Sequence, residues 1–320
     1  MLRDIIHSRE RTLRFYGISP PKASNGTERN REIADMWAER LNGLSENLDG
    51  VIVYDLQDEP GRTGTVRPFP FLPTLDPLGF VHEYLSSVHA PKIIYKRVAG
   101  LPEGALKEWL TRLQNNNSDD VAVLVGSPTV QKPAFPRPEG LTLAAASRFT
   151  RDTFPDGCFG GVAIAERHAD KKNEDIRLLA KYRDGCKFFV TQTVYDAKAA
   201  CTLITDYART FTEAEIDPPP LIFSFAPCGS IKTMEFMQWL GIRFPVWITE
   251  ELRNARDILS RSVALSETIG SEITAHARSC GVPTGMNVES ISIRREEIDA
   301  SCKLFTSLAT GPYKPEHYRY

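Results

Sequence analysis

The sequence predicts a single (β/α)8 barrel that spans residues 1–320. Eight short apolar runs alternate with helix-period segments along the chain. These runs are continuously apolar, as expected of parallel strands buried on both faces. A length of 320 residues also fits a barrel of about 250 residues with insertions. The alternative is a doubly wound sheet, which would place a glycine-rich phosphate turn after the first strand. The segment GISPP at 17–21 is not such a turn.

The strands and helices follow in order between an N-terminal extension at 1–12 and a C-terminal tail at 309–320. The expected strands are 13–19, 50–55, 92–95, 121–126, 159–165, 187–193, 221–225 and 285–293. The expected helices are 31–44, 78–88, 102–113, 141–150, 175–183, 197–211, 232–240, 250–280 with a break near Gly270, and 296–308.

Proline and glycine set several of these boundaries. The first strand has to end at Pro20 and Pro21, since proline cannot donate a hydrogen bond to a strand ladder. Pro102 suits the first turn of a helix, and the Gly-Val-Pro sequence at 281–283 stops the long helical region. The proline-rich and glycine-rich loop at 56–77 is long for a compact domain, which indicates a functional loop.

Composition excludes several classes of protein. A formal net charge of −2 argues against nucleic acid or an anionic membrane as the main partner. The chain has no membrane-length apolar run and no apolar signal core near its start, so we expect a cytoplasmic protein. Six scattered cysteines and six unclustered histidines predict neither a disulfide framework nor a metal site. Oligomeric state is left open.

Polar residues follow the expected strands at the point where a barrel carries its chemistry. They are Tyr54, Asp55, Gln57, Asp58 and Glu59 after the second strand, Ser127 after the fourth, Glu166, Arg167 and His168 after the fifth, Gln192, Thr193, Tyr195 and Asp196 after the sixth, and Arg294 to Glu297 after the eighth. For Asp196 and Glu297 a helix cap or solvated loop is the preferred interpretation. Gln192 ends an apolar strand, so we expect its side chain in the barrel mouth.

The segment GCKFFVTQTVYD at 185–196 resembles the sixth strand of the methylenetetrahydrofolate reductase family. The segment VAIAERH at 162–168 is similar to that family's fifth-strand sequence, and residues 15–21 resemble its first strand. Weaker similarity continues through 222–247, where Pro227 and the RFPVW sequence lie, and through IRREE at 293–297. The match runs from about residue 13 to residue 308.

The resemblance implies a folate barrel that reduces 5,10-methylenetetrahydrofolate to 5-methyltetrahydrofolate, usually through FAD reduced by NADH or NADPH. It implies that Gln192 binds the pterin, whose donors and acceptors suit an amide. It places Arg295 near the glutamate tail of the substrate, where a guanidinium can bind a carboxylate. Tyr195 is a third expected substrate-binding residue. The resemblance further places Ser127, Glu166, His168 and Lys181 beside the flavin or its phosphates.

Five positions depart from the family pattern. Gly17 stands where the family has the glutamate that acts as general acid, and Ser127 stands where it has an aspartate. The others are Ile164, Ala180 and Ile231, all at flavin or pterin positions. Two interpretations stay open for the predicted cofactor site. In one the nicotinamide delivers its hydride directly to the folate without FAD, and in the other FAD is kept in an altered pocket, its phosphates bound by Lys181 and Arg177.

An acid from the loop after the second strand could replace the missing glutamate. Glu59 and Asp55 are the predicted catalytic residues, because ring opening needs a proton on the leaving nitrogen. The sequence does not distinguish NADH from NADPH. Two other classes remain open: a folate barrel with a different one-carbon transfer, and a folate-binding relative without turnover.

Overall fold

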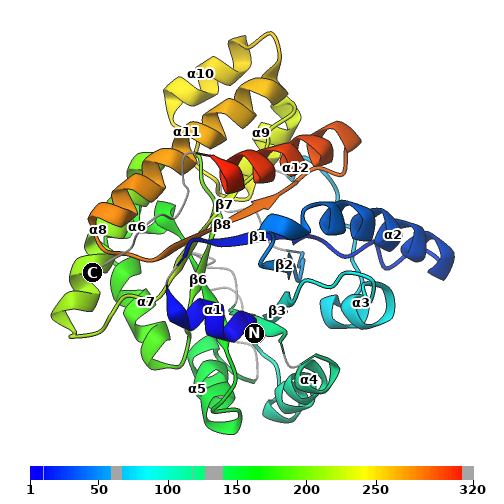
Figure 1. The fold of residues 1–320 in the computed structure, drawn as a ribbon, viewed down its shortest axis with the longest axis vertical. Coiled ribbons are helices and arrows are strands. Elements are labelled where there is room, and N and C mark those ends of the chain that lie inside the picture. The colour runs from blue at the N-terminus through cyan, green and yellow to red at the C-terminus, as the bar shows by residue number, and fades with distance from the viewer. Residues whose placement is uncertain (10, 59–66, 118, 127–139, 312–320) are drawn as a thin grey trace.

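The computed structural model describes residues 1–9, 11–58, 67–117, 119–126 and 140–311. Eight parallel strands close into a barrel in sequence order, and β8 pairs with β1 (Figure 1). This confirms the predicted (β/α)8 barrel. The strands are β1 Leu13–Ile18, β2 Gly50–Val53, β3 Lys92–Arg97, β4 Val121–Val125, β5 Phe159–Ala163, β6 Phe189–Thr193, β7 Leu221–Phe225 and β8 Thr284–Glu289.

Helices surround the barrel, as Figure 1 shows. They are α1 Leu2–Ser8, α2 Thr27–Gly43, α3 Pro77–Tyr84, α4 Glu103–Asn116, α5 Leu143–Thr153, α6 Ala165–Lys171, α7 Glu174–Arg183, α8 Ala197–Glu213, α9 Ile231–Trp239, α10 Val246–Asn254, α11 Ile258–Ser279 and α12 Arg295–Thr310, with a 3-10 turn at Ser45–Asn47. In the described part of the chain, no helix is long and apolar enough to cross a membrane.

The apolar core has two layers. One lies between the strands and the outer helices, and it includes most of the buried side chains. The other fills the barrel interior, where Phe15, Phe188 and Ile222 pack together. Leu2 and Ile6 of α1 join this inner layer, so the N-terminal extension folds as a helix that covers the barrel interior. The sequence had predicted an extension there but no helix.

Several predicted boundaries differ from the structure. The eighth strand ends at Glu289 and not at 293, because Ser290 turns the chain with a 2.7 Å bond from its hydroxyl to the Ser292 carbonyl. A separate helix, α6, follows β5 directly. The region 250–280 breaks at 255–257, where Asp257 caps α11, and it continues unbroken through Gly270. A Cβ at Gly270 would lie 3.0 Å from Leu308, so glycine there allows α11 and α12 to pack closely.

Replacement of Gly160 tests the packing inside the barrel. A Cβ at this position of β5 would lie 2.5 Å from the ring of Phe188, which is fully buried. We expect Gly160→Ala to lower the unfolding free energy by about 1–3 kcal/mol, as overpacking does in a close-packed core. Chemical denaturation followed by circular dichroism measures the change.

Gly104→Ala is the matched control. This glycine lies in α4 with no atom within 4 Å of an added Cβ. The same substitution there should raise the unfolding free energy by about 0.5–1 kcal/mol, since alanine favours a helix more than glycine does. Equal effects at both positions would contradict the packing argument.

Candidate functional site

The carboxyl ends of the eight strands meet at one end of the barrel, which we call the mouth. Parallel closure requires this arrangement, and it gathers polar side chains that are far apart in the sequence. Five of them form a hydrogen-bonded cluster, which we call the strand-end network: Tyr54 after β2, Thr193 of β6, Ser224 of β7, and Asn287 and Glu289 of β8.

Asn287 connects the strand-end network across the barrel. Its Nδ2 donates to the Tyr54 hydroxyl at 2.8 Å and to the Ser224 hydroxyl at 3.1 Å. The side chain is fully buried, and its Oδ1 has no hydrogen-bond partner among the described residues. A buried amide oxygen without a partner is uncommon and costs free energy, so it marks a place where a ligand or water can donate.

Glu289 is the carboxyl of the strand-end network. The Thr193 hydroxyl donates to it at 2.7 Å, and the Tyr54 hydroxyl also hydrogen-bonds to it. Burial raises the pKa of Glu289, and the two hydroxyl donors only partly oppose this effect. Burial likewise raises the pKa of Tyr54 well above its usual range, so the phenol keeps its proton.

Gly17 completes this side of the mouth. It pairs with Glu289 in the β1–β8 register. A Cβ at Gly17 would lie 2.8 Å from the ring of Tyr54 and 3.2 Å from Oδ1 of Asn287. The Tyr54 ring therefore occupies the volume that a side chain at position 17 would need. The ring is also held by an edge contact with Tyr95, at 4.9 Å between centroids.

A second polar group lies at the β5–β6 side of the mouth. Gln192 donates from Nε2 to the carbonyl of Leu240 at 2.9 Å, and the Arg243 backbone N–H lies 3.5 Å from Glu166. The segment 240–243 thus brings Gln192 and Glu166 together. Glu166 is 7% exposed, and burial raises its pKa to about 7.

An open cavity of about 740 Å³ lies beside the loops that follow β2 and β3. Asp55, Lys96 and Arg97 line it together with segments of the loop between β2 and α3. Asp55 accepts the Arg97 backbone N–H at 2.8 Å and Nε2 of Gln57 at 2.5 Å. The cavity is large enough for part of a drug-sized ligand and carries both signs of charge.

The end of the loop between β2 and α3 links two sides of the mouth. Its backbone bonds to the segment after β1, through Ala23 N to the Pro73 carbonyl at 2.8 Å. Its Phe69 ring contacts Phe236 of α9 edge-on, and the Arg67 guanidinium lies 4.7 Å from the centroid of Trp239. The described end of the predicted functional loop therefore packs against the segment after β1 and against α9.

Three predicted site residues lie away from the mouth. Tyr195 is fully buried, stacks on Phe244 and donates to the Ala226 carbonyl. His168 is 1% exposed and lies between Asp206 of α8 and Asp175 of α7. The structure does not bring these two, or Lys181, into contact with the mouth.

Lys181 has structural contacts that its position in the sequence did not reveal. Its ammonium group donates to the Val162 carbonyl, and its alkyl chain packs over Gly161 of β5. Burial lowers the pKa of Lys181. The neighbouring Arg177 pairs with the buried Glu174, with 3.4 Å between Nε and Oε2.

The other predicted residues divide into three cases. Glu59 and Ser127 lie outside the described residues. Arg295 begins α12, is 86% exposed and pairs with Asp299 at 3.5 Å. Asp196 caps α8, which confirms its interpretation as a helix cap. For Glu297 the interpretation as a cap or solvated loop residue is wrong, because this side chain lies in the first turn of α12, is 1% exposed and accepts the Gly229 N–H.

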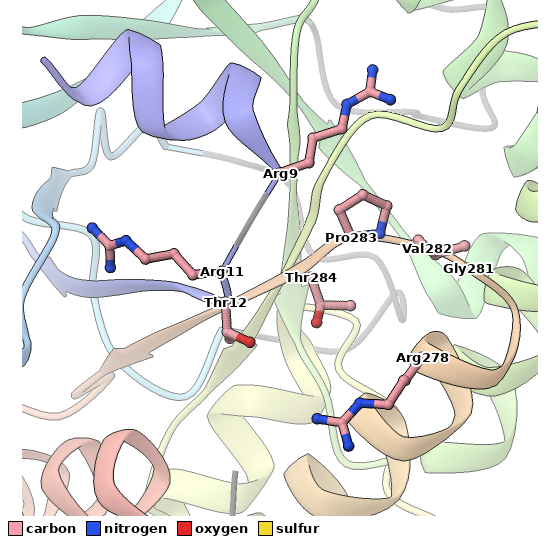
Figure 2. A pocket seen from close by; sticks show the side chains of 8 residues that line it. All are labelled: Arg9, Arg11, Thr12, Arg278, Gly281, Val282, Pro283 and Thr284. Carbon is pink, nitrogen blue, oxygen red and sulfur yellow. The ribbon is translucent and has the colours of Figure 1, made fainter. Parts of the chain in front are cut away.

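A small pocket at the opposite end of the barrel carries three arginines (Figure 2). It has a volume of about 90 Å³ between the start of β1 and the segment before β8. Arg9 pairs with Asp217 at 3.3 Å and Arg11 with Asp49 at 2.7 Å. Figure 2 shows their guanidinium groups pointing to opposite sides, so these two arginines do not converge on a common anion.

The sequence analysis missed Asn287 and Glu289. Their signal was present, because two polar residues two positions apart in an apolar strand face the same side. The predicted strand ran to residue 293, which made Glu289 look like a mid-strand residue and hid its place at the mouth.

The fold and the site define this protein as a (β/α)8 barrel with a polar, ligand-sized mouth. No family model matches the chain, and no curated protein matches it. Among solved structures, it is similar to a Clostridium thermocellum protein described as uncharacterized and as binding two copies of 5-methyl-5,6,7,8-tetrahydrofolic acid. The identity is 37% over 97% of this chain and 99% of that chain, with a TM-score of 0.81. The chain belongs to the same family as that Clostridium thermocellum protein.

The buried carboxyl of Glu166 makes stability depend on pH. Its pKa is raised from 4.5 to about 7 in the folded state, so the folded protein holds a proton that the unfolded chain releases. Relative to Glu166→Gln, the wild type should lose up to about 3 kcal/mol of unfolding free energy as the pH rises from 4.5 to about 7. Urea denaturation of both proteins at a series of pH values measures this. The exposed Glu272→Gln is the control, and parallel curves for wild type and Glu166→Gln would contradict the assignment.

Proposed function

We propose that this protein binds a reduced folate at the mouth of its barrel and reduces 5,10-methylenetetrahydrofolate to 5-methyltetrahydrofolate. The observation that carries the proposal is the relative at 37% identity over nearly the whole chain, which binds 5-methyltetrahydrofolate. That molecule is the product of the proposed reaction. The similarity of 185–196 and 162–168 to the methylenetetrahydrofolate reductase family supports the same reaction.

Gln192 is the proposed contact for the pterin ring. A pterin presents neighbouring donors and acceptors, which a carboxamide can meet with its oxygen and its N–H groups. The bond from Nε2 of Gln192 to the Leu240 carbonyl fixes the orientation of the amide.

Arg295 is the proposed contact for the glutamate tail. Its side chain is exposed at the start of α12, next to the end of β8. A guanidinium there can form a charged pair with a carboxylate that extends out of the mouth. Because the arginine is exposed, this contact should contribute little free energy and should weaken with salt.

Three described residues that were assigned to a flavin or its phosphates have other partners instead. Lys181 is bonded to a backbone carbonyl, Arg177 is paired with Glu174, and His168 is buried between two carboxyl groups. None of these described groups faces the mouth with a free donor for a phosphate. We therefore derive no step through FAD and propose NADH or NADPH as the direct hydride donor.

The proposed reaction balances with a nicotinamide as co-substrate. The reduced nicotinamide gives a hydride to the methylene carbon, which becomes the methyl group on N5. The bond from that carbon to N10 breaks, and N10 takes a proton. The protein contributes by holding the two reactants together at the mouth, which can supply several kcal/mol of the barrier reduction.

A folate-binding protein without turnover is the second candidate. It is favoured by the departures from the reductase pattern at Gly17 and Ile231, and by the relative, which is described by what it binds. The two candidates share the binding site and differ in hydride transfer alone.

Oxidation of NADH or NADPH separates the two candidates. We expect folate-dependent oxidation by the purified protein with no flavin added, followed at 340 nm with and without 5,10-methylenetetrahydrofolate. A requirement for added FAD would contradict direct transfer. Absence of oxidation with both nucleotides, with FAD present, would exclude the reductase and leave the binding protein.

Replacement of Gln192 tests the pterin contact. Gln192→Ala should weaken 5-methyltetrahydrofolate binding about 10-fold, which corresponds to the loss of one good hydrogen bond of about 1.4 kcal/mol. Calorimetric titration measures the affinity. Gln114→Ala is the matched control, because Gln114 is exposed on α4, away from the mouth. Unchanged affinity in Gln192→Ala would place the pterin elsewhere.

A further inference from the structure

Ring opening in the proposed reaction requires an acid at the mouth. The bond between the methylene carbon and N10 breaks readily only when N10 receives a proton. The acid has to hold a proton near neutral pH. Its hydrogen-bond partners also have to suit both the carboxylic acid and the carboxylate that remains after the proton is given up. Two described carboxyl groups near the mouth, those of Asp55 and Glu289, differ in their hydrogen-bond partners.

Asp55, after β2, is one of these carboxyl groups. Both of its hydrogen bonds come from N–H donors, the Arg97 backbone and the Gln57 amide. An N–H group can donate but cannot accept, so neither partner could accept a hydrogen bond from a protonated carboxyl group at Asp55. Asp55 also lines the cavity beside the loops that follow β2 and β3.

Glu289 differs from Asp55 in the kind of hydrogen-bond partner that surrounds it. Its partners are the hydroxyl groups of Thr193 and Tyr54, and a hydroxyl can donate to a carboxylate or accept from a carboxylic acid. The Tyr54 oxygen already accepts from Nδ2 of Asn287, which leaves the phenolic proton for Glu289. The carboxyl is half-buried at the carboxyl end of β8, so it keeps access to the mouth.

Gly17 and Tyr54 fix the position of Glu289. The absence of a side chain at Gly17 lets the Tyr54 ring lie beside β1, opposite Glu289 in the β1–β8 register. Tyr54 is therefore a positioning residue for the carboxyl. The side chain at Gly17 could not be restored without displacing this ring.

From this geometry we propose that Glu289 is the acid that protonates N10 as the ring of 5,10-methylenetetrahydrofolate opens; this inference rests on the proposed function. The proton moves from the Glu289 carboxyl to N10 while the electron pair of the broken carbon–nitrogen bond stays on N10. The methylene carbon then takes the hydride from NADH or NADPH. Solvent returns a proton to the Glu289 carboxylate before the next turnover.

The groups around Glu289 agree with this role. Among the described residues, the titratable side chains beside it are Tyr54, after β2, and Tyr95 of β3, and burial raises the pKa of both phenols. Thr193 and Asn287 are its uncharged polar neighbours on β6 and β8. Burial is the largest cause of the raised pKa of Glu289, so the acid form persists to higher pH than in water.

Glu289→Gln is the variant that tests the inference. Glutamine keeps the size and hydrogen-bonding capacity of the side chain but cannot give up a proton. We expect kcat to fall about 100-fold or more, within the range for loss of a general acid. We expect 5-methyltetrahydrofolate affinity within about 3-fold of wild type, because the folate needs no proton to bind. Glu272→Gln on α11 is the exposed matched control and should keep full activity.

The pH profile provides a readout that a structural role would not change. The kcat of the wild type should fall as the pH rises through the raised pKa of Glu289, and Glu289→Asp should keep this limb at a lower rate. Glu289→Gln should lose the limb. If Asp55→Asn loses it instead, Asp55 is the acid and the inference is overturned.

The outcomes separate the two proposals. If the wild type shows no folate-dependent oxidation, the proposed function fails and the inference fails with it. If the wild type turns over and Glu289→Gln keeps its rate, the inference alone is overturned. Loss of folate binding together with turnover in Glu289→Gln, in a folded protein, would also overturn it and assign Glu289 to binding.

Discussion

Each strand of this barrel pairs with a neighbour on both sides, so β8 has to close against β1. That pairing places Gly17 beside Glu289, although 272 positions separate them in the sequence (289 − 17). Closure also brings the ends of β2, β6 and β7 to the same mouth. The strand-end network depends on this constraint, since its five side chains come from four different strand ends.

The packing of Tyr54 into the space beside Gly17 shows how one small residue shapes the site. A side chain at position 17 and the Tyr54 ring cannot occupy the same volume. With glycine at 17, the tyrosine hydroxyl reaches both Asn287 and Glu289. The acid that the family has at the position of Gly17 is, in our proposal, replaced by Glu289 of the neighbouring strand, whose partners are hydroxyl groups.

The polar residues that the sequence and the structure point to are of two kinds: proposed ligand contacts and residues with structural contacts. Gln192, Asp55 and Glu289 are half-buried at strand ends. His168 and Tyr195 also follow strands closely in the sequence, and Lys181 lies further on in α7, yet their side chains pack between helices and strands. His168 on α6 and Lys181 on α7 each have structural partners, so these two side chains do not lie where the sequence similarity placed them.

The sequence by itself determined the barrel, the order of its elements and the placement of Gln192 at a strand end, because apolar periodicity and proline positions are local signals. It also indicated the loop after β2 as functional. Only the tertiary structure decided which polar residues meet. Glu289 could not be assigned to the mouth until the end of β8 was known, and its partners come from strands far away in sequence. Side-chain direction, burial and cross-strand register are properties of the closed barrel, and no single segment carries them.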